Sequence, residues 1–92
     1  MPVFVNIPTL LRSYTQDNKR VEAQGSTVRE VVDDLERHYP GIRQRLMDEQ
    51  RQHRFINLYL NDEDIRFLDN LETAVADHDE LIILPAVAGG AR

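Results

Sequence analysis

The carboxyl end of the sequence carries the residues whose types most suggest a chemical role. An apolar run, Leu81 to Leu84, is followed by Pro85, and the glycine pair Gly89-Gly90 precedes the final Ala91-Arg92. From Pro85 to Gly90 the chain can extend roughly 15–20 Å, at about 3.3–3.6 Å per residue. Because the side chains of this segment are small, a narrow tunnel can admit it. The segment is therefore a candidate for insertion into the active-site channel of another protein.

The ordinary explanation of such a segment is a frayed chain end. Small residues and glycines collect at termini that have no structural role. With glycine at about 7% of residues, a glycine pair falls in the last few positions of about 2% of chains by chance. The glycine pair alone does not decide between the two explanations, so the rest of the chain has to.

Length and composition predict one small domain with a single core. The chain has 92 residues, of which 41% are hydrophobic and 29% are charged, which is ordinary for a globular protein. We see no run long enough to cross a membrane and no signal peptide, and we expect a cytoplasmic protein. A small domain with an exposed working tail is most simply a monomer.

Charge and cysteine content argue against several classes of function. The net charge is −5, whereas nucleic-acid binding depends on clustered Lys and Arg. A basic protein surface is a better partner for an acidic chain. Without cysteine the chain has no disulfide, no thiolate nucleophile and no sulfur ligand for a metal.

The remaining polar residues indicate neither a metal site nor a catalytic site. Three histidines lie far apart without metal-ligand spacing, namely His38, His53 and His78. We expect His38 to interact with the dipole of the helix that it ends. The acidic run Asp62-Glu63-Asp64 lacks the spacing of a calcium loop and is expected to be a solvated hairpin tip. Gly25 stands alone, without a phosphate loop, and no Ser or Thr pattern predicts an activated nucleophile. We therefore predict no catalytic residue, no bound cofactor and no metal.

Patterns of apolar and turn-forming residues predict the strands that must hold the tail. We predict an N-terminal hairpin from strands at 2–7 and 19–24, joined by a turn-rich connection at 9–18. A strand at 55–60 is followed by a turn at 61–64 and a returning strand at 65–67. The polar stretch 48–54 is expected to be a solvated loop. In the last strand, at 81–84, the pairing should stop at Pro85, which has no amide hydrogen.

The one strong helix signal begins at Thr27, which forms a capping box with Glu30. Apolar residues then recur at helical spacing, namely Val28, Val31, Val32, Leu35 and Tyr39. Pro40-Gly41 ends this helix, one loose turn at 42–47 follows, and a brief helical turn is expected near 71–75. The element order predicts an α+β domain of the β-grasp, ubiquitin-like plan, a mixed sheet of four to five strands with one main helix across it. We place this domain at 1–86 and a flexible tail at 87–92.

With this element order, four segments make the chain resemble the ubiquitin-like sulfur carrier proteins. That family includes the molybdopterin synthase small subunit and the thiamine-biosynthesis carrier, and the likeness is greatest to its cysteine-synthesis branch. The segments are Ile7-Pro8-Thr9-Leu10-Leu11-Arg12, Arg45-Leu46-Met47-Asp48, His53-Arg54-Phe55-Ile56-Asn57 with Asn61-Asp62-Glu63-Asp64, and Ile83-Leu84-Pro85-Ala86-Val87-Ala88-Gly89-Gly90. The last segment is the most specific of the four.

The resemblance implies that the tail is a substrate for other enzymes. In this family an adenylating enzyme of the ubiquitin-activating type joins AMP from ATP to the terminal glycine, and a sulfur donor then gives a thiocarboxylate. Gly90 would carry the sulfur, a pyridoxal-phosphate-dependent cysteine synthase would use it, and a JAMM-type zinc metalloprotease would release the product. Other residues would seat the tail against these enzymes, namely Leu84, Pro85, Val87, Ala88 and Gly89.

The chain departs from the family pattern after the glycine pair. The terminal carboxylate belongs to Arg92, so Gly90 cannot be adenylated until Ala91-Arg92 is removed. We interpret the chain as a precursor that the metalloprotease cuts between Gly90 and Ala91; the alternative is a remnant or an unprocessed end.

Three other functions stay open at this point. The chain resembles, in fold, a ubiquitin-like modifier that would join Gly90 to a lysine, and also the permanent small subunit of a molybdopterin-synthase-type enzyme. The third is a plain β-grasp binding module whose glycines have no role. The sequence also leaves open whether cysteine, a cofactor or a natural product finally receives the sulfur.

Overall fold

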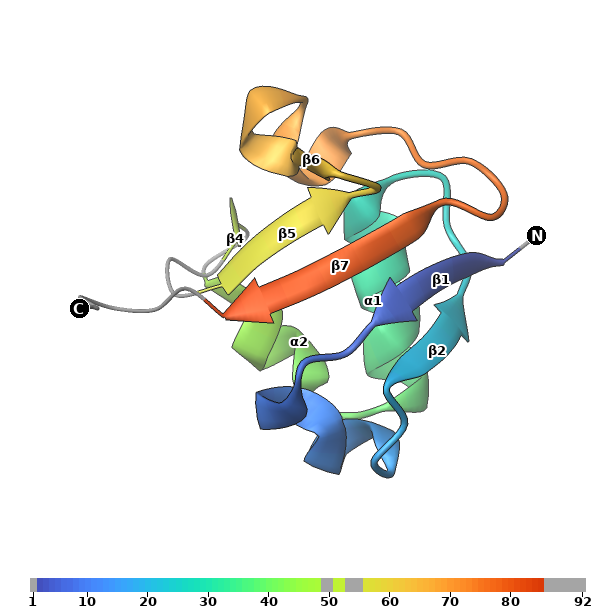
Figure 1. Ribbon diagram of the computed structural model, residues 1–92, viewed down its shortest axis with the longest axis vertical. Coiled ribbons are helices and arrows are strands. Elements are labelled where there is room, and N and C mark those ends of the chain that lie inside the picture. The colour runs from blue at the N-terminus through green and yellow to red at the C-terminus, as the bar shows by residue number, and fades with distance from the viewer. Residues whose placement is uncertain (1, 49–50, 53–55, 86–92) are drawn as a thin grey trace.

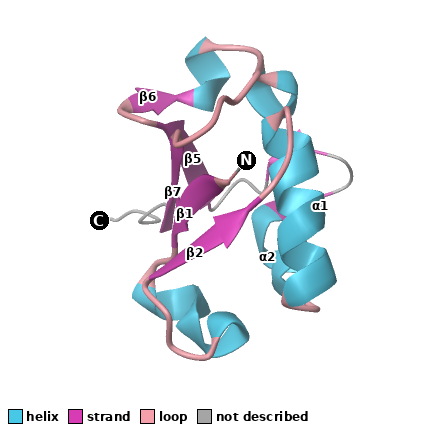
Figure 2. Ribbon diagram, turned by 90° about the vertical axis from the view of Figure 1, so that its right-hand side faces the viewer, coloured by secondary structure: helices cyan, strands magenta, loops and turns pink. Residues whose placement is uncertain are grey.

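A five-stranded mixed sheet with one main helix across it forms the body of the protein (Figures 1 and 2). The computed structural model describes residues 2–48, 51–52 and 56–85. The strand order in the sheet is β2-β1-β7-β5-β6. Its strands are β1 (Val3–Asn6), β2 (Arg20–Ala23), β5 (Ile56–Leu60), β6 (Glu63–Asp64) and β7 (Glu80–Pro85).

Helices and a separate short strand pair complete the fold, and both α-helices lie on the same side of the sheet (Figure 2). The α-helices are α1 (Val28–His38) and α2 (Ile42–Leu46), and the 3-10 helices are η1 (Thr9–Thr15), η2 (Ile65–Phe67) and η3 (Asn70–Glu72). The separate pair consists of β3 (Met47–Asp48) and β4 (Arg51–Gln52). No helix in the described ranges is long and apolar enough to span a bilayer.

The last of the described strands, β7, lies in the middle of the sheet. β7 runs parallel to β1, with Val5 opposite Leu81, and antiparallel to β5, with Leu58 opposite Ile83. β1 and β2 form the predicted N-terminal hairpin. The α+β, β-grasp fold predicted from the element order is therefore confirmed.

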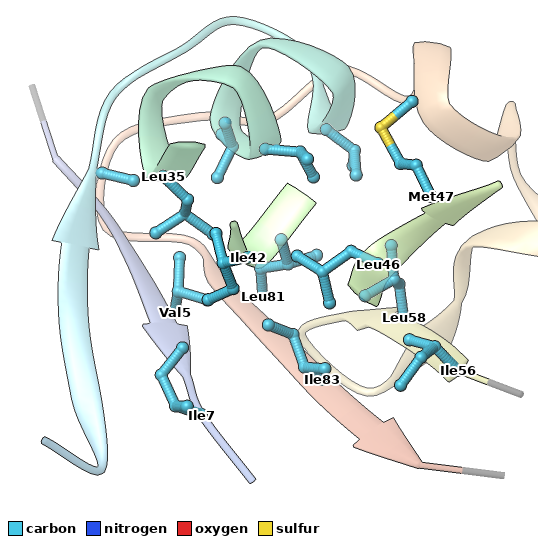
Figure 3. Packing of buried hydrophobic residues seen from close by; sticks show 14 of the residues in the cluster. Val5, Ile7, Leu35, Ile42, Leu46, Met47, Ile56, Leu58, Leu81 and Ile83 are labelled. Carbon is cyan, nitrogen blue, oxygen red and sulfur yellow. The ribbon is translucent and has the colours of Figure 1, made fainter. Parts of the chain in front are cut away.

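One hydrophobic core fills the space between the sheet and the helices. Figure 3 shows the side chains of Val5 and Ile83, from the sheet, in one cluster with those of Leu35, from α1, and Ile42, from α2. All of these side chains are buried. The alternation predicted for β1 is confirmed, because its odd-numbered apolar residues face this core.

Side chains that bind backbone amides fix both α-helices at their starts. The Thr27 hydroxyl accepts a hydrogen bond from the Glu30 amide at 3.2 Å, as the capping box predicts. The Glu30 carboxylate accepts from the amide of Ser26, one residue earlier than the standard box, at 2.7 Å. At the next helix, Glu36 accepts from the amides of Gly41 at 3.0 Å and Arg43 at 2.9 Å. These amides lower the pKa of Glu36.

The connection at 9–18 joins β1 to β2 as predicted, and it also contains η1. Three other predictions of local structure are wrong. The solvated loop at 48–54 contains the β3–β4 pair. The strand returning beside β5 is Glu63–Asp64, and residues 65–67 form η2 because the Asp64 carboxylate binds the Arg66 amide at 2.9 Å. Pro85 belongs to β7, opposite Ile56. A proline is tolerated there because, beyond Ile82, β7 has a partner strand on one side only.

We expect the core position Leu58 to carry much more stability than the surface position Leu10. Leu58 is fully buried, whereas Leu10 is 69% exposed. Leu58→Ala should lower the free energy of unfolding by about 2–5 kcal/mol, because it removes buried methyl groups and leaves a cavity. Leu10→Ala, the same chemical change, should stay within about 0.5 kcal/mol of the unaltered protein. Urea unfolding measures both, and equal losses would contradict this packing.

Candidate functional site

β7 places the start of the predicted tail-recognition segment at one end of the sheet (Figure 1). Leu81 and Ile83 are buried in the core, and they anchor the strand. Leu84, the next residue, is 45% exposed. Pro85 pairs in register with Ile56, which is buried at the start of β5. The described part of the chain thus ends in a paired strand, with the exposed apolar side chain of Leu84 near its end.

The other predicted site residues lie outside the described residues. They are Val87, Ala88, Gly89, Gly90 and Ala91, together with the predicted domain boundary at 86. Their assigned roles in tail seating, adenylation and processing stay predictions. Of the predicted site residues, the structure describes Leu84 and Pro85, at the end of β7.

Segments that are distant in sequence meet at this end of the sheet. A hollow between η1, α2 and β5 is lined by Leu10, Leu11, Ser13, Tyr14, Arg45 and Ile56. Three of the segments that carry the family resemblance contribute to it, through Leu10, Arg45 and Ile56. The Arg45 Nε donates to the Tyr14 hydroxyl at 2.8 Å, and this hydrogen bond raises the pKa of Arg45. The motifs therefore cluster around the strand pair at which the tail begins.

The acidic run at the β5–β6 turn is only partly the solvated tip that the sequence predicts. Asp62 and Glu63 are exposed, but Asp64 is only 8% exposed. Arg66 donates to Asp64 Oδ2 at 2.8 Å and to Asn57 Oδ1 at 2.5 Å. The side-chain hydrogen bonds from Arg66 are the main reason why the pKa of Asp64 is lowered. Asp64 is a structural anchor for η2, which sequence reasoning missed.

The histidines take part in local contacts. His38 Nδ1 lies 3.0 Å from the carbonyl oxygen of Asp34, in the last turn of α1, as expected for a histidine at a helix end. The His78 ring stacks on Phe4, with 6.1 Å between ring centroids. His53 lies outside the described residues. Within the residues described, no group of three or more His, Cys, Asp or Glu side chains is arranged to hold a metal ion.

A β-grasp domain whose central strand leads into a glycine-rich tail defines the ubiquitin-like class of small proteins. The chain belongs to the ThiS family, which matches its residues 5–90. This membership confirms the family expected from the four sequence segments.

Comparison with individual proteins agrees with this assignment. The sulfur carrier protein CysO of Mycobacterium tuberculosis is 54% identical over 93 residues, which cover 98% of this chain and 100% of that protein. A chain in the crystal structure of the Amycolatopsis orientalis BexX/CysO complex is 57% identical, with a TM-score of 0.91 over 96% of this chain and 99% of that one. Small archaeal modifier protein 3 of Haloferax volcanii is 34% identical over 65 residues, 71% of each chain. These relatives are named as carriers or modifiers, which confirms the expectation of a protein co-substrate in place of an enzyme.

We expect the Asp64–Arg66 pair to contribute a pH-dependent part of the stability. The folded protein holds the pKa of Asp64 below its ordinary value of 3.8, so the contribution is complete above that value. It is lost as the pH falls through the lower pKa of the folded state. Asp64→Asn should therefore cost on the order of 1 kcal/mol at about pH 7 and progressively less in acid. Unfolding curves across this range measure the difference.

The matched control for this experiment is Asp62→Asn, because Asp62 is exposed and forms no ion pair among the described residues. Its loss of stability should be small and should not depend on pH in the same way. A pH-independent loss for Asp64→Asn would contradict the role assigned to the ion pair.

Proposed function

We propose that this chain is a sulfur carrier protein that is activated at Gly90 after removal of Ala91-Arg92. The observation that carries this proposal is the match to the ThiS family, which runs through Gly90 and ends there, two residues before the end of the chain. The full-length similarity to the sulfur carrier protein CysO supports the same function. The position where the match ends also favours a precursor that is trimmed to the glycine pair.

The proposed chemistry takes place at the terminal carboxylate and consists of two substitutions. A carboxylate oxygen of Gly90 attacks the α-phosphorus of ATP, pyrophosphate leaves, and an acyl-adenylate forms. A sulfur nucleophile supplied by a donor then attacks the carbonyl carbon, and AMP leaves with the carboxylate oxygen. With hydrosulfide as the nucleophile, the bound S–H loses its proton and the product is a thiocarboxylate. The partner adenylating enzyme binds ATP, so the carrier needs no cofactor of its own.

The domain contributes a rigid handle for this chemistry. An acyl-adenylate is a reactive mixed anhydride that survives best where water is excluded, so the tail has to enter a partner's active site. β7 is fixed in the sheet by the buried Leu81 and Ile83, while Leu84 is exposed at the exit. These features support a complex in which the tail-recognition residues contact the partner and the folded domain stays outside the partner's active site.

The proposed partners are three enzymes that handle the same tail. They are a ubiquitin-activating-type adenylyltransferase that also transfers sulfur, a pyridoxal-phosphate-dependent cysteine synthase and a JAMM-type zinc metalloprotease. Similarity to CysO favours cysteine as the final acceptor. The solved BexX/CysO complex, in which one chain is 57% identical to this protein, supports assembly with a partner protein.

A second candidate function is that of a protein modifier. It is favoured by the similarity to small archaeal modifier protein 3, at 34% identity. A modifier would use the same activation at Gly90, but a lysine amine would capture the acyl group in place of sulfur. The two functions therefore differ in the nucleophile and agree on the reactive residue.

Intact-mass measurements test the sulfur carrier proposal. Chain 1–90, incubated with an adenylating enzyme, ATP and a sulfide source, should exchange one oxygen atom for one sulfur atom. The 92-residue chain should stay unchanged until a JAMM-type protease removes Ala91-Arg92. Chain 1–90 with a C-terminal amide is the matched control, because it keeps every residue and lacks the carboxylate.

Three outcomes would count against the proposal. They are uptake of sulfur by the amidated control, uptake by the untrimmed chain, and no uptake by chain 1–90 under conditions that load a known carrier. A lysine conjugate of chain 1–90 that forms without sulfur uptake would favour the modifier function.

A further inference from the structure

A groove with a positively charged rim lies beside the C-terminal half of β7, on the side toward β1. Its lining includes Pro8, Arg12, Lys19, Arg20, Ile82 and Leu84. Ile82 is half-buried, and Leu84 is exposed. The β7 side of the lining is therefore apolar, and the basic side chains that form its rim come from η1, β2 and the connection between them.

The groove exists because β1 leaves the sheet earlier than β5 does. β1 pairs with β7 as far as Asn6 opposite Ile82, whereas β5 continues to Ile56 opposite Pro85. An open strand edge of this kind often receives an added strand. Here Pro8 and Pro85 border the edge, and neither has an amide hydrogen to donate to an added strand. Recognition at this groove therefore depends on side chains.

Two of the cations at the rim have no carboxylate partner among the described residues. Arg12 donates from Nε to the carbonyl oxygen of Ile7 at 3.1 Å, and it forms no ion pair there. Lys19 is exposed, likewise has no ion pair in the described ranges, and is the only lysine in the chain. Arg20, by contrast, forms an ion pair in which its Nε lies 3.6 Å from Glu80 Oε2, and its guanidinium stacks over the ring of Phe4. The charges free to attract a partner are those of Arg12 and Lys19.

The sign of this local charge is opposite to the net charge of −5. A basic partner surface, expected from the net charge alone, would be repelled at the place where the tail leaves the domain. A partner with carboxylates around an apolar contact would instead be attracted there, and attraction of this kind acts mainly on the encounter rate.

We propose that this groove binds an acidic segment of the adenylating partner, with the partner's carboxylates on Arg12 and Lys19 and its apolar side chains on Ile82 and Leu84. The proposal rests on the sulfur carrier function given above. The partner surface that receives the domain should therefore carry carboxylates around an apolar contact, while the tail enters the active site. The groove then sets the affinity for the carrier, and the terminal carboxylate alone undergoes the reaction.

Steady-state adenylation of chain 1–90 tests the proposal. The readout is pyrophosphate release at varied carrier concentration, at about 20 mM and about 500 mM salt, so that screening of surface charge differs strongly. Lys19→Gln should raise KM several-fold at low salt and leave kcat unchanged, and Lys19→Glu should raise KM further. Lys19→Arg keeps the charge and should retain the KM of the unaltered chain. At high salt the differences should largely disappear.

The matched control is Gln44→Glu, which lowers the net charge by one unit, as Lys19→Gln does. Gln44 is exposed on α2 and does not line the groove, and Figure 2 shows α2 in the helical layer beside α1. Its KM should stay close to that of the unaltered chain at both salt concentrations. Equal effects of Gln44→Glu and Lys19→Gln would assign the change to net charge and overturn the groove proposal.

Two further outcomes separate this inference from the function on which it rests. If the unaltered chain 1–90 is adenylated and the Lys19 variants match it at low salt, the groove proposal is wrong and the carrier function stands. If the unaltered chain releases no pyrophosphate with enzymes that activate a known carrier, the carrier function fails, and the groove proposal fails with it.

Discussion

Burial of β7 at the centre of the sheet is the constraint on which the rest of the structure depends. Leu81 and Ile83 lie in the core, and the strand has a neighbour on each side over its first half. Opening this strand would expose Leu81 and Ile83 to water, so β7 resists fraying and its end at Pro85 is a defined point in the structure. The hollow at η1, the groove beside β1 and the exposed Leu84 all lie around that point. In the proposed function, the fold serves to present the segment that follows β7 to a partner.

The proposed function divides recognition and chemistry between different parts of this protein. The described domain offers ion pairs that stabilise local structure, such as Asp64–Arg66, and contact surfaces near the exit of β7. The reactive group of the proposed function is a backbone carboxylate, which needs no side-chain nucleophile. This division is consistent with a chain that has no cysteine and yet is proposed to carry sulfur.

Periodic patterns made most of the fold predictable, because they report which face of an element is buried. The alternation around Val5 and the capping box at Thr27 both lead to the elements that the structure shows. The 3-10 segment after Asp64 was not predictable in this way, since one side-chain bond to the Arg66 amide decides it. The groove depends on Lys19 and Leu84, which only the sheet topology brings together. The proposed sulfur chemistry came from resemblance to a family, because a glycine tail has no side chains to indicate a reaction.

The central claim is that partners recognise the folded domain and modify the tail. The most direct test compares kcat/KM for adenylation of chain 1–90 with that of a synthetic peptide of residues 84–90, which has the same terminal carboxylate. We predict that the peptide is poorer by about 100-fold or more, because binding energy from the domain is missing. Equal values for the peptide and the chain would contradict the claim and would assign recognition to the tail alone.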